Sequence, residues 1–80
     1  MEIIILGTGC SRCKALEAAV RKTVEATGID ATVRKIEDME QIMAYNVMTL
    51  PALVVDGKVV SKGKVLNETE VKTLLGLSAT

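Results

Sequence analysis

The chain is 80 residues long, with ten Lys and Arg side chains, ten Asp and Glu side chains, no His and a net charge of zero. This length predicts one domain over residues 1–80. The balanced charge excludes nucleic-acid binding driven by phosphate neutralisation, and the hydrophobic fraction of 49% excludes a disordered chain. One Tyr is the whole aromatic content, so a platform for stacking bases is missing, and without His the commonest metal and acid–base side chain is missing too.

The first third of the chain predicts a strand followed by a long helix. Residues 2–6 are mostly β-branched and almost all apolar, as in a strand that is covered on both faces. Gly-Thr-Gly at 7–9 ends this strand, and a helix is predicted over 11–27, with Gly28 as its stop. The apolar residues on one face of this helix are Cys13, Leu16, Val20 and Val24.

A second strand and a short helix are predicted next. Residues 29–36 form the strand, and its wetter face carries Thr32 and Arg34. Asp38 with Gln41 three residues later resembles a capping box, so a helix begins here and ends near residue 46. The apolar stripe of this helix consists of Met39, Ile42 and Met43.

The last third predicts a hairpin and a final helix. Residues 52–55 and 58–61 are two strands joined by Asp-Gly, one of the strongest hairpin signals in a sequence. Asn67 caps the final helix, with Glu70 at its third position, and Gly76 ends it. The residues of this helix that face the core are Val71, Leu74 and Leu75.

The predicted order of elements is therefore β-α-β-α-β-β-α, an α/β fold. The crossover from the first strand to the second is right-handed, which makes these two strands parallel. The hairpin adds two antiparallel strands on the other side of the first strand. The result is a four-stranded mixed sheet flanked by helices, with the first strand near its centre.

The sequence also indicates where the chain works. No segment approaches 18 uncharged apolar residues, and the start of the chain lacks the basic region and the long apolar core of a signal peptide. We therefore expect a cytoplasmic protein that binds neither membrane nor nucleic acid. In the cytosol, structural disulfides are rare, and paired cysteines are more often catalytic or metal-binding.

The two cysteines, Cys10 and Cys13, form one C-x-x-C motif where the first strand turns into the helix. The helix N-terminus and the neighbouring Arg12 and Lys14 favour a thiolate at Cys10, so its pKa should lie below that of an ordinary thiol. Cys13 begins the apolar stripe, so it should be buried. An exposed thiolate beside a sheltered thiol suits thiol–disulfide exchange, in which the first attacks and the second resolves the mixed disulfide.

Three other uses of this motif compete with that interpretation. A structural disulfide would close a four-residue loop, which removes only about 2 kcal/mol of chain entropy. A structural zinc site needs four ligands, and the chain has two Cys and no His. A copper chaperone of the heavy-metal-associated type also carries C-x-x-C after its first strand, and two thiolates suit Cu(I). Against this alternative, the Met that precedes the motif in those proteins is absent, and their fold ends β-α-β.

The single proline lies in Thr49-Leu50-Pro51, at the start of the predicted third strand. Taken alone, Pro51 marks an ordinary strand edge, because proline lacks the N–H of a central ladder. Together with the C-x-x-C motif and the order of elements, it makes the whole chain resemble the thioredoxin superfamily. In particular the chain resembles the glutaredoxin-like small redox-active disulfide proteins of prokaryotes, whose active-site loop is similar to residues 7–14, Gly-Thr-Gly-Cys-Ser-Arg-Cys-Lys.

The resemblance implies a thiol–disulfide oxidoreductase with a redox-active Cys10–Cys13 disulfide, no bound cofactor and no metal. It implies a cis peptide bond before Pro51, and a groove in which the backbone of Leu50 binds an extended substrate. The groove residues by position are Thr49, Leu50, Pro51 and Gly63. Tuning of the site falls to the residues around the cysteines, which are Thr8, Gly9, Ser11, Arg12 and Lys14.

The resemblance also implies partners: a flavin-dependent disulfide reductase as electron donor, and a disulfide-containing protein or small thiol compound as substrate, with the chain itself a monomer. Two departures from the thioredoxin pattern stand out. Ser11-Arg12 separates the cysteines in place of Gly-Pro, so the redox potential does not carry over. Ile4 stands where thioredoxins have a buried acid, so a water, Cys10 itself or a base from solvent would move protons to the resolving thiol.

Overall fold

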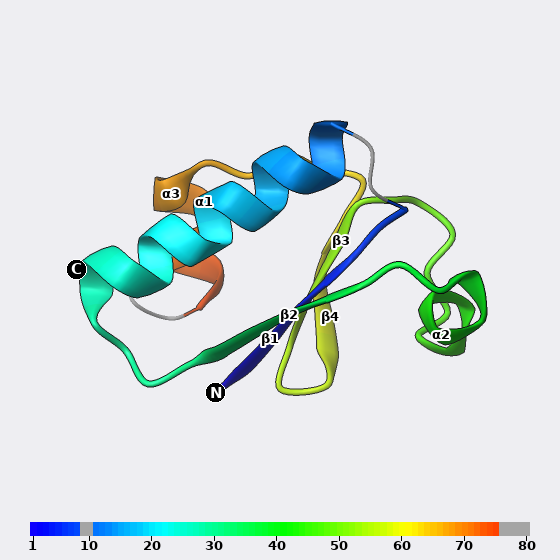
Figure 1. Ribbon diagram of the computed structural model, residues 1–80, viewed down its shortest axis with the longest axis horizontal. Helices are drawn as coiled ribbons and strands as arrows, with labels where there is room; N and C mark the ends of the chain where they lie inside the picture. The colour runs from blue at the N-terminus through cyan, green and yellow to red at the C-terminus, as the bar shows by residue number, and fades with distance from the viewer. Residues whose placement is uncertain (9–10, 76–80) are drawn as a thin grey trace.

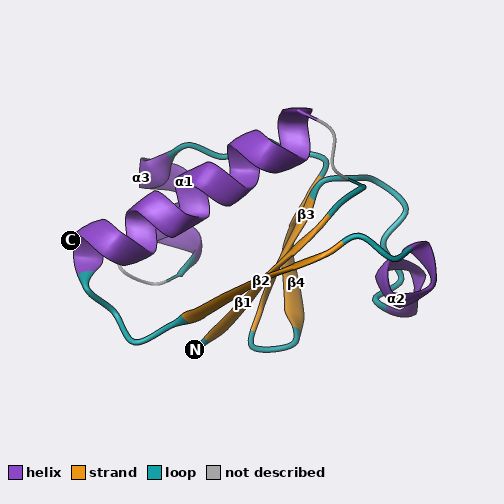
Figure 2. Cartoon of the chain, viewed as in Figure 1, coloured by secondary structure: helices purple, strands orange, loops and turns teal. Residues whose placement is uncertain are grey.

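The apolar strand at the start of the chain lies in the middle of the sheet, in a computed structural model that describes residues 1–8 and 11–75. The strands are β1 (Glu2–Leu6), β2 (Thr32–Ile36), β3 (Ala52–Val55) and β4 (Lys58–Lys62). β1 pairs in parallel with β2 and antiparallel with β3, and the order across the sheet is β2-β1-β3-β4. Figure 2 draws these strands in orange. The predicted four-stranded mixed sheet is confirmed, because an apolar strand is favoured where both of its neighbours and both of its faces are covered.

Helices cover both faces of this sheet (Figure 1). They are α1 (Ser11–Thr27), α2 (Met39–Ala44) and α3 (Glu68–Leu74). Side chains alternate between the two faces along β1. Ile3 and Ile5 join the core cluster that contains residues of α1 and α3, whereas Ile4 and Leu6 join the cluster that contains Ile42 of α2. The predicted α/β fold is therefore built as a sheet between two helices on one face and one helix on the other.

The cap that begins α3 and the turn that joins β3 to β4 are formed by the residues that the sequence predicts. Asn67 Oδ1 accepts a hydrogen bond from Glu70 N at 2.8 Å, and Glu70 Oε1 accepts one from Asn67 N at 3.2 Å. This reciprocal pair is the predicted capping box of α3. Asp56 and Gly57 have φ values of 49° and 83°, which suit the tight two-residue turn between β3 and β4.

The second strand begins later than predicted. The sequence predicts a strand over 29–36, but β2 begins at Thr32, directly opposite Glu2. Because β1 itself begins at Glu2, the parallel ladder does not extend back to Ile29 or Ala31. These two residues instead pack their side chains against the core cluster of α1 and α3.

The buried faces of two helices differ from the predicted stripes. In α1, Val24 is only half-buried, and Thr23 is buried instead. Thr23 tolerates burial because its hydroxyl donates a hydrogen bond to the carbonyl one turn earlier, at 2.7 Å. In α2, Ile42 is buried but Met39 and Met43 are exposed, because this six-residue helix presents little more than one turn to the sheet.

Smaller differences concern the ends of elements. Asp38 begins α2 by accepting a hydrogen bond from Glu40 N at 2.9 Å, one residue earlier than the capping box with Gln41 would place it. β4 extends one residue beyond the prediction, to Lys62. Gly76, the predicted end of the last helix, lies outside the described residues. Among the described helices, none is long and apolar enough to cross a membrane.

Leu53 is fully buried on β3 between β1 and α1, so truncating it should destabilise the fold strongly. We expect Leu53→Ala to lower the free energy of unfolding by about 2–5 kcal/mol, because the cavity it leaves cannot close fully. Met48→Ala removes a side chain of similar size that is almost wholly exposed. This change should alter the free energy of unfolding by less than about 0.5 kcal/mol. Urea unfolding of both variants checks this, and similar losses would contradict the core assignment.

Candidate active site

Cys13 is fully buried on the first turn of α1, against the end of β1. The residue it meets there is Gly7, whose backbone N–H donates to Ile36 O at 3.0 Å and continues the pairing with β2. A methyl group built on Gly7 would lie 2.9 Å from Cys13 Cβ, closer still to Cys13 Sγ, and 4.0 Å from Pro51 Cβ. Cys13 therefore occupies the space that a side chain at position 7 would need, and Pro51 closes that space from another side.

Gly63 joins the other predicted parts of the site. Its N–H donates to Pro51 O at 2.7 Å, and its carbonyl accepts a hydrogen bond from Arg12 Nη2 at 2.8 Å. The φ of Gly63 is +69°, a conformation that favours glycine. A methyl group there would overlap Cγ2 of Thr49. Gly63 therefore links the end of β4 both to the first turn of α1 and to the Thr49–Pro51 segment.

The Thr49–Pro51 segment enters β3 next to Cys13. The peptide bond between Leu50 and Pro51 is cis. Pro51 is fully buried, Leu50 is half-buried and Thr49 is exposed. Since Pro51 precedes Ala52, the first residue of β3, it removes no hydrogen bond from the ladder.

The predicted site residues thus divide into those that meet and those that surround them. Residues from α1, the Thr49–Pro51 segment and the end of β4 meet: Arg12, Cys13, Thr49, Pro51 and Gly63. The exposed surroundings are Thr8, Ser11 and Lys14. Gly9 and Cys10 lie outside the described residues. Two features escaped the sequence analysis: Gly7 as the residue that makes room for Cys13, and Arg12 as a hydrogen-bond donor to Gly63.

A metal site is not formed by the groups that the structure describes. Over residues 1–8 and 11–75, no set of three or more His, Cys, Asp or Glu side chains lies together as the ligands of an ion would. Cys13, the one cysteine among these residues, is fully buried.

Comparison with known proteins assigns this arrangement to a family. The family described as the thioredoxin domain matches residues 1–76. The chain belongs to the thioredoxin family. It is 43% identical over 75 residues to a thioredoxin of Methanothermobacter thermautotrophicus, an alignment that covers 94% of this chain and 97% of that protein. It is 37% identical over 70 residues to a thioredoxin of Methanocaldococcus jannaschii, with 88% of this chain and 80% of that protein covered.

This assignment decides between the oxidoreductase and the copper chaperone. The predicted membership of the thioredoxin superfamily is confirmed, and with it the prediction of a thiol–disulfide oxidoreductase. The alternative, a copper chaperone of the heavy-metal-associated type, is not supported by the family or by its relatives. The observed order of elements, which ends β-β-α, is also not that of the chaperone.

The contact between Gly63 and Thr49 can be tested with a matched pair of glycines. Gly28 has nearly the same φ as Gly63, +66° against +69°, but open space where its side chain would be. Gly28→Ala should therefore lower the free energy of unfolding by about 1–2 kcal/mol, because alanine is strained in this left-handed conformation. Gly63→Ala should cost about 1–3 kcal/mol more, because its methyl group overlaps Thr49.

Thr49→Ser removes the Cγ2 methyl that Gly63→Ala would strike, so the double variant should return to the stability of Gly28→Ala. Thr49 is exposed, and Thr49→Ser alone should be close to wild type. Urea unfolding of the four variants measures these differences. Additive losses in the double variant would show that the two residues do not touch.

Proposed function

We propose that Cys10 and Cys13 are the redox couple of this oxidoreductase, with Cys10 as the nucleophile and Cys13 as the resolving thiol. The Cys10 thiolate attacks one sulfur of a substrate disulfide, forms a mixed disulfide and releases the first substrate thiol. The Cys13 thiol then attacks Cys10 Sγ, which releases the second substrate thiol and leaves a Cys10–Cys13 disulfide. Two electrons and two protons pass from the dithiol to the substrate.

The observation that carries this division of roles is the full burial of Cys13 on the first turn of α1. A fully buried thiol packed against Gly7 is poorly placed to meet a substrate, but it lies three residues from Cys10 in the chain. Cys10 directly precedes Ser11, the first residue of α1, and the N–H groups and dipole at a helix start favour a thiolate. Exposed Arg12 and Lys14 add positive charge on the same turn.

We further propose that the Thr49–Pro51 segment binds the substrate, with the backbone of Leu50 pairing with an extended stretch on one side of the disulfide. Gly63 supports this role because it fixes Pro51 through its N–H and Arg12 through its carbonyl. A substrate strand on Leu50 would then lie beside the first turn of α1. Arg12 tunes the site by holding that turn to the end of β4.

The reaction requires an electron donor and a substrate but no bound cofactor. The oxidised Cys10–Cys13 disulfide must be reduced again, and we propose a flavin-dependent disulfide reductase for this step. The substrate is a disulfide in a protein or in a small thiol compound. We propose that the chain works in the cytoplasm, where paired cysteines are more often catalytic or metal-binding than structural, and that it works there as a monomer.

The proposed roles predict opposite behaviour of two variants. With reduced protein and insulin, Cys13→Ser should accumulate a mixed disulfide because the resolving thiol is gone, whereas Cys10→Ser should form none. At pH 7, limiting iodoacetamide should label Cys10 before Cys13 in the wild type. Mass spectrometry under non-reducing conditions measures both. Equal labelling of the two thiols, or a mixed disulfide on Cys10→Ser, would contradict this division of roles.

A further inference from the structure

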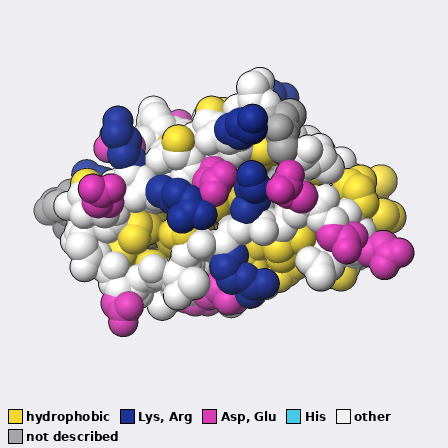
Figure 3. All heavy atoms as spheres, in the orientation of Figure 1, with side chains coloured by type: hydrophobic (Ala, Val, Ile, Leu, Met, Phe, Trp, Pro, Cys, Tyr) yellow, Lys and Arg dark blue, Asp and Glu magenta, His cyan; other side chains and the backbone are white. Residues whose placement is uncertain are grey.

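Basic side chains gather where the elements of the site meet. The segments that contain the site, residues 7–16, 47–53 and 61–67, carry Lys and Arg but no Asp or Glu, although the whole chain is neutral. Figure 3, in the view of Figure 1, shows Lys and Arg side chains over the first turns of α1. At the end of β4, Lys62 and Lys64 adjoin Gly63, whose carbonyl binds Arg12. All three cations are exposed, and we call them the cationic rim.

Arg12 is fixed on the side of α1 that faces the end of β4. Successive residues of a helix lie about 100° apart around its axis, so Arg12 and Lys14 flank the buried Cys13 on opposite sides. Arg12 Nη2 donates to Gly63 O at 2.8 Å, and this bond uses one of the five N–H groups of a guanidinium. A carboxylate that approaches this edge therefore meets an arginine that is already positioned, and little further side-chain entropy is lost.

The charge of the cationic rim is not used within the fold. Over residues 1–8 and 11–75, Arg12, Lys62 and Lys64 form no ion pair with an acidic side chain. Cations farther from the site do form such pairs, and they are Arg21, Lys22, Arg34 and Lys35. The rim is therefore a set of exposed positive charges that a partner can neutralise.

The acidic residues of the adjoining helices are engaged or lie elsewhere. Glu70 of α3 borders the same surface hollow as Lys64, but its Oε1 accepts a hydrogen bond from Asn67 N at 3.2 Å in the cap of α3. Glu68 pairs with Lys22 at 3.8 Å. The acids of the third helix, Asp38 and Glu40, begin α2.

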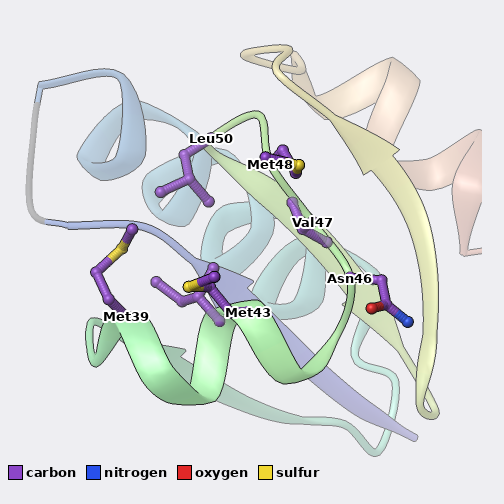
Figure 4. Close-up of a pocket in the computed structure, with 7 residues that line it drawn as sticks. Met39, Met43, Asn46, Val47, Met48 and Leu50 are labelled. Atoms are coloured by element: carbon purple, nitrogen blue, oxygen red, sulfur yellow. The ribbon is translucent and has the colours of Figure 1, made fainter.

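The side chain of Leu50 points toward α2, on the side of Met39 and Met43 (Figure 4). The rim instead lies at the end of β4, where Gly63 N donates to Pro51 O at 2.7 Å. A chain that pairs with the backbone of Leu50 thus has α2 on the side of the Leu50 side chain and the rim at Gly63.

We propose that the cationic rim makes this oxidoreductase prefer protein disulfides whose cysteine is flanked by Asp or Glu. This inference rests on the proposed function, since it takes an extended substrate to lie on the backbone of Leu50. The rim attracts the acidic flank before the disulfide reaches Cys10, which raises the rate of productive encounter. Arg12, Lys62 and Lys64 are then specificity-determining residues, and they leave the sulfur chemistry to the cysteines.

The charges of the rest of the chain favour a short acidic stretch over a larger polyanion. Outside the three segments that contain the site, the chain carries all ten Asp and Glu side chains and only six Lys and Arg. A nucleic acid or an anionic membrane surface would extend beyond the rim, meet this acidic remainder and be repelled by it. One or two acidic residues beside a cysteine complement the rim without reaching that remainder.

The test uses stoichiometric reduced protein, so that no reductase is needed. The probes are three peptides, each with one cysteine blocked as its S-methyl disulfide and flanked on both sides by Glu, Gln or Lys. Neutral bis(2-hydroxyethyl) disulfide and anionic dithiodiglycolate are the small disulfides. Acid-quenched mass spectrometry gives each second-order rate constant, which is divided by that of dithiothreitol with the same disulfide to remove differences in intrinsic reactivity.

At low salt we expect the normalised rate to be about tenfold higher for the Glu peptide than for the Lys peptide, with the Gln peptide between them. At about 0.5 M salt the ratio should fall below about threefold, because the Debye length shrinks to about 4 Å. Each ratio compares two peptides on the same protein, so a change in the reactivity of Cys10 cancels.

Variants of the rim and a matched variant elsewhere locate the effect. Lys62→Glu and, separately, Lys64→Glu should bring the two normalised rates close together. Lys58→Glu makes the same charge change at the other end of β4, about 13 Å along the strand from Lys62, and should keep most of the tenfold preference. Arg12→Gln should lower the preference, and Arg12→Lys should restore part of it. All four positions are exposed, so the fold should survive each change.

Several results would overturn the inference. Equal normalised rates with the Glu and Lys peptides, or a preference that survives in Lys62→Glu and Arg12→Gln, would show that the rim does not select substrates. A loss in Lys58→Glu as large as that in Lys62→Glu would assign the preference to net charge. Faster reduction of dithiodiglycolate than of the neutral small disulfide, without a peptide preference, would assign the rim to small anionic thiol compounds. A wild type that reduces none of the disulfides would overturn the proposed function as well, whereas equal peptide rates overturn the inference alone.

Discussion

Cys13 and Gly7 approach so closely that a side chain at position 7 cannot be accommodated, and the rest of the site depends on this contact. It brings the first turn of α1 onto the end of the central strand, where β1 still pairs with β2 through Gly7 N–H. The thiol lies against the strand end, and Pro51 borders the same space at position 7. A buried thiol one turn into a helix is thereby set beside the place where a third element enters the sheet.

Gly63 fixes the remaining side of the site. It holds Pro51 with its N–H and Arg12 with its carbonyl, and it leaves no room for a side chain beside Thr49. Two glycines, far apart in the chain, therefore bring α1, β3 and the end of β4 together, while the charged Arg12 side chain stays exposed. In our proposal the redox chemistry needs only this enclosure, the helix start at Cys10, and an adjacent backbone edge at Leu50.

The sequence predicts the parts of this protein that depend on local chemistry. The apolar residues of β1, the Asp-Gly turn and the Asn67–Glu70 cap are each encoded within a few residues, so the order of elements and the sheet follow from them. Contacts between distant residues are not encoded in this way. Arg12 and Gly63 are 51 positions apart, and the sequence around neither residue predicts their hydrogen bond. In the sequence, Gly7 looks like an ordinary end of a strand, and its contact with Cys13 is seen only in the folded chain.

The enclosure of Cys13 by Gly7 can be measured directly in a Cys10→Ser background, where Cys13 is the remaining thiol. The rate of its alkylation under native conditions reports how often the contact opens. Gly7→Ala should raise this rate at least about tenfold more than its loss of global stability alone would. A local loss of about 1.4 kcal/mol at the contact corresponds to that factor. Gly28→Ala, where the added methyl group meets nothing, gives the rise that global destabilisation alone produces. If the alkylation rate of Gly7→Ala rises no more than its loss of global stability explains, with Gly28→Ala as the control, the claim that Gly7 encloses Cys13 is wrong.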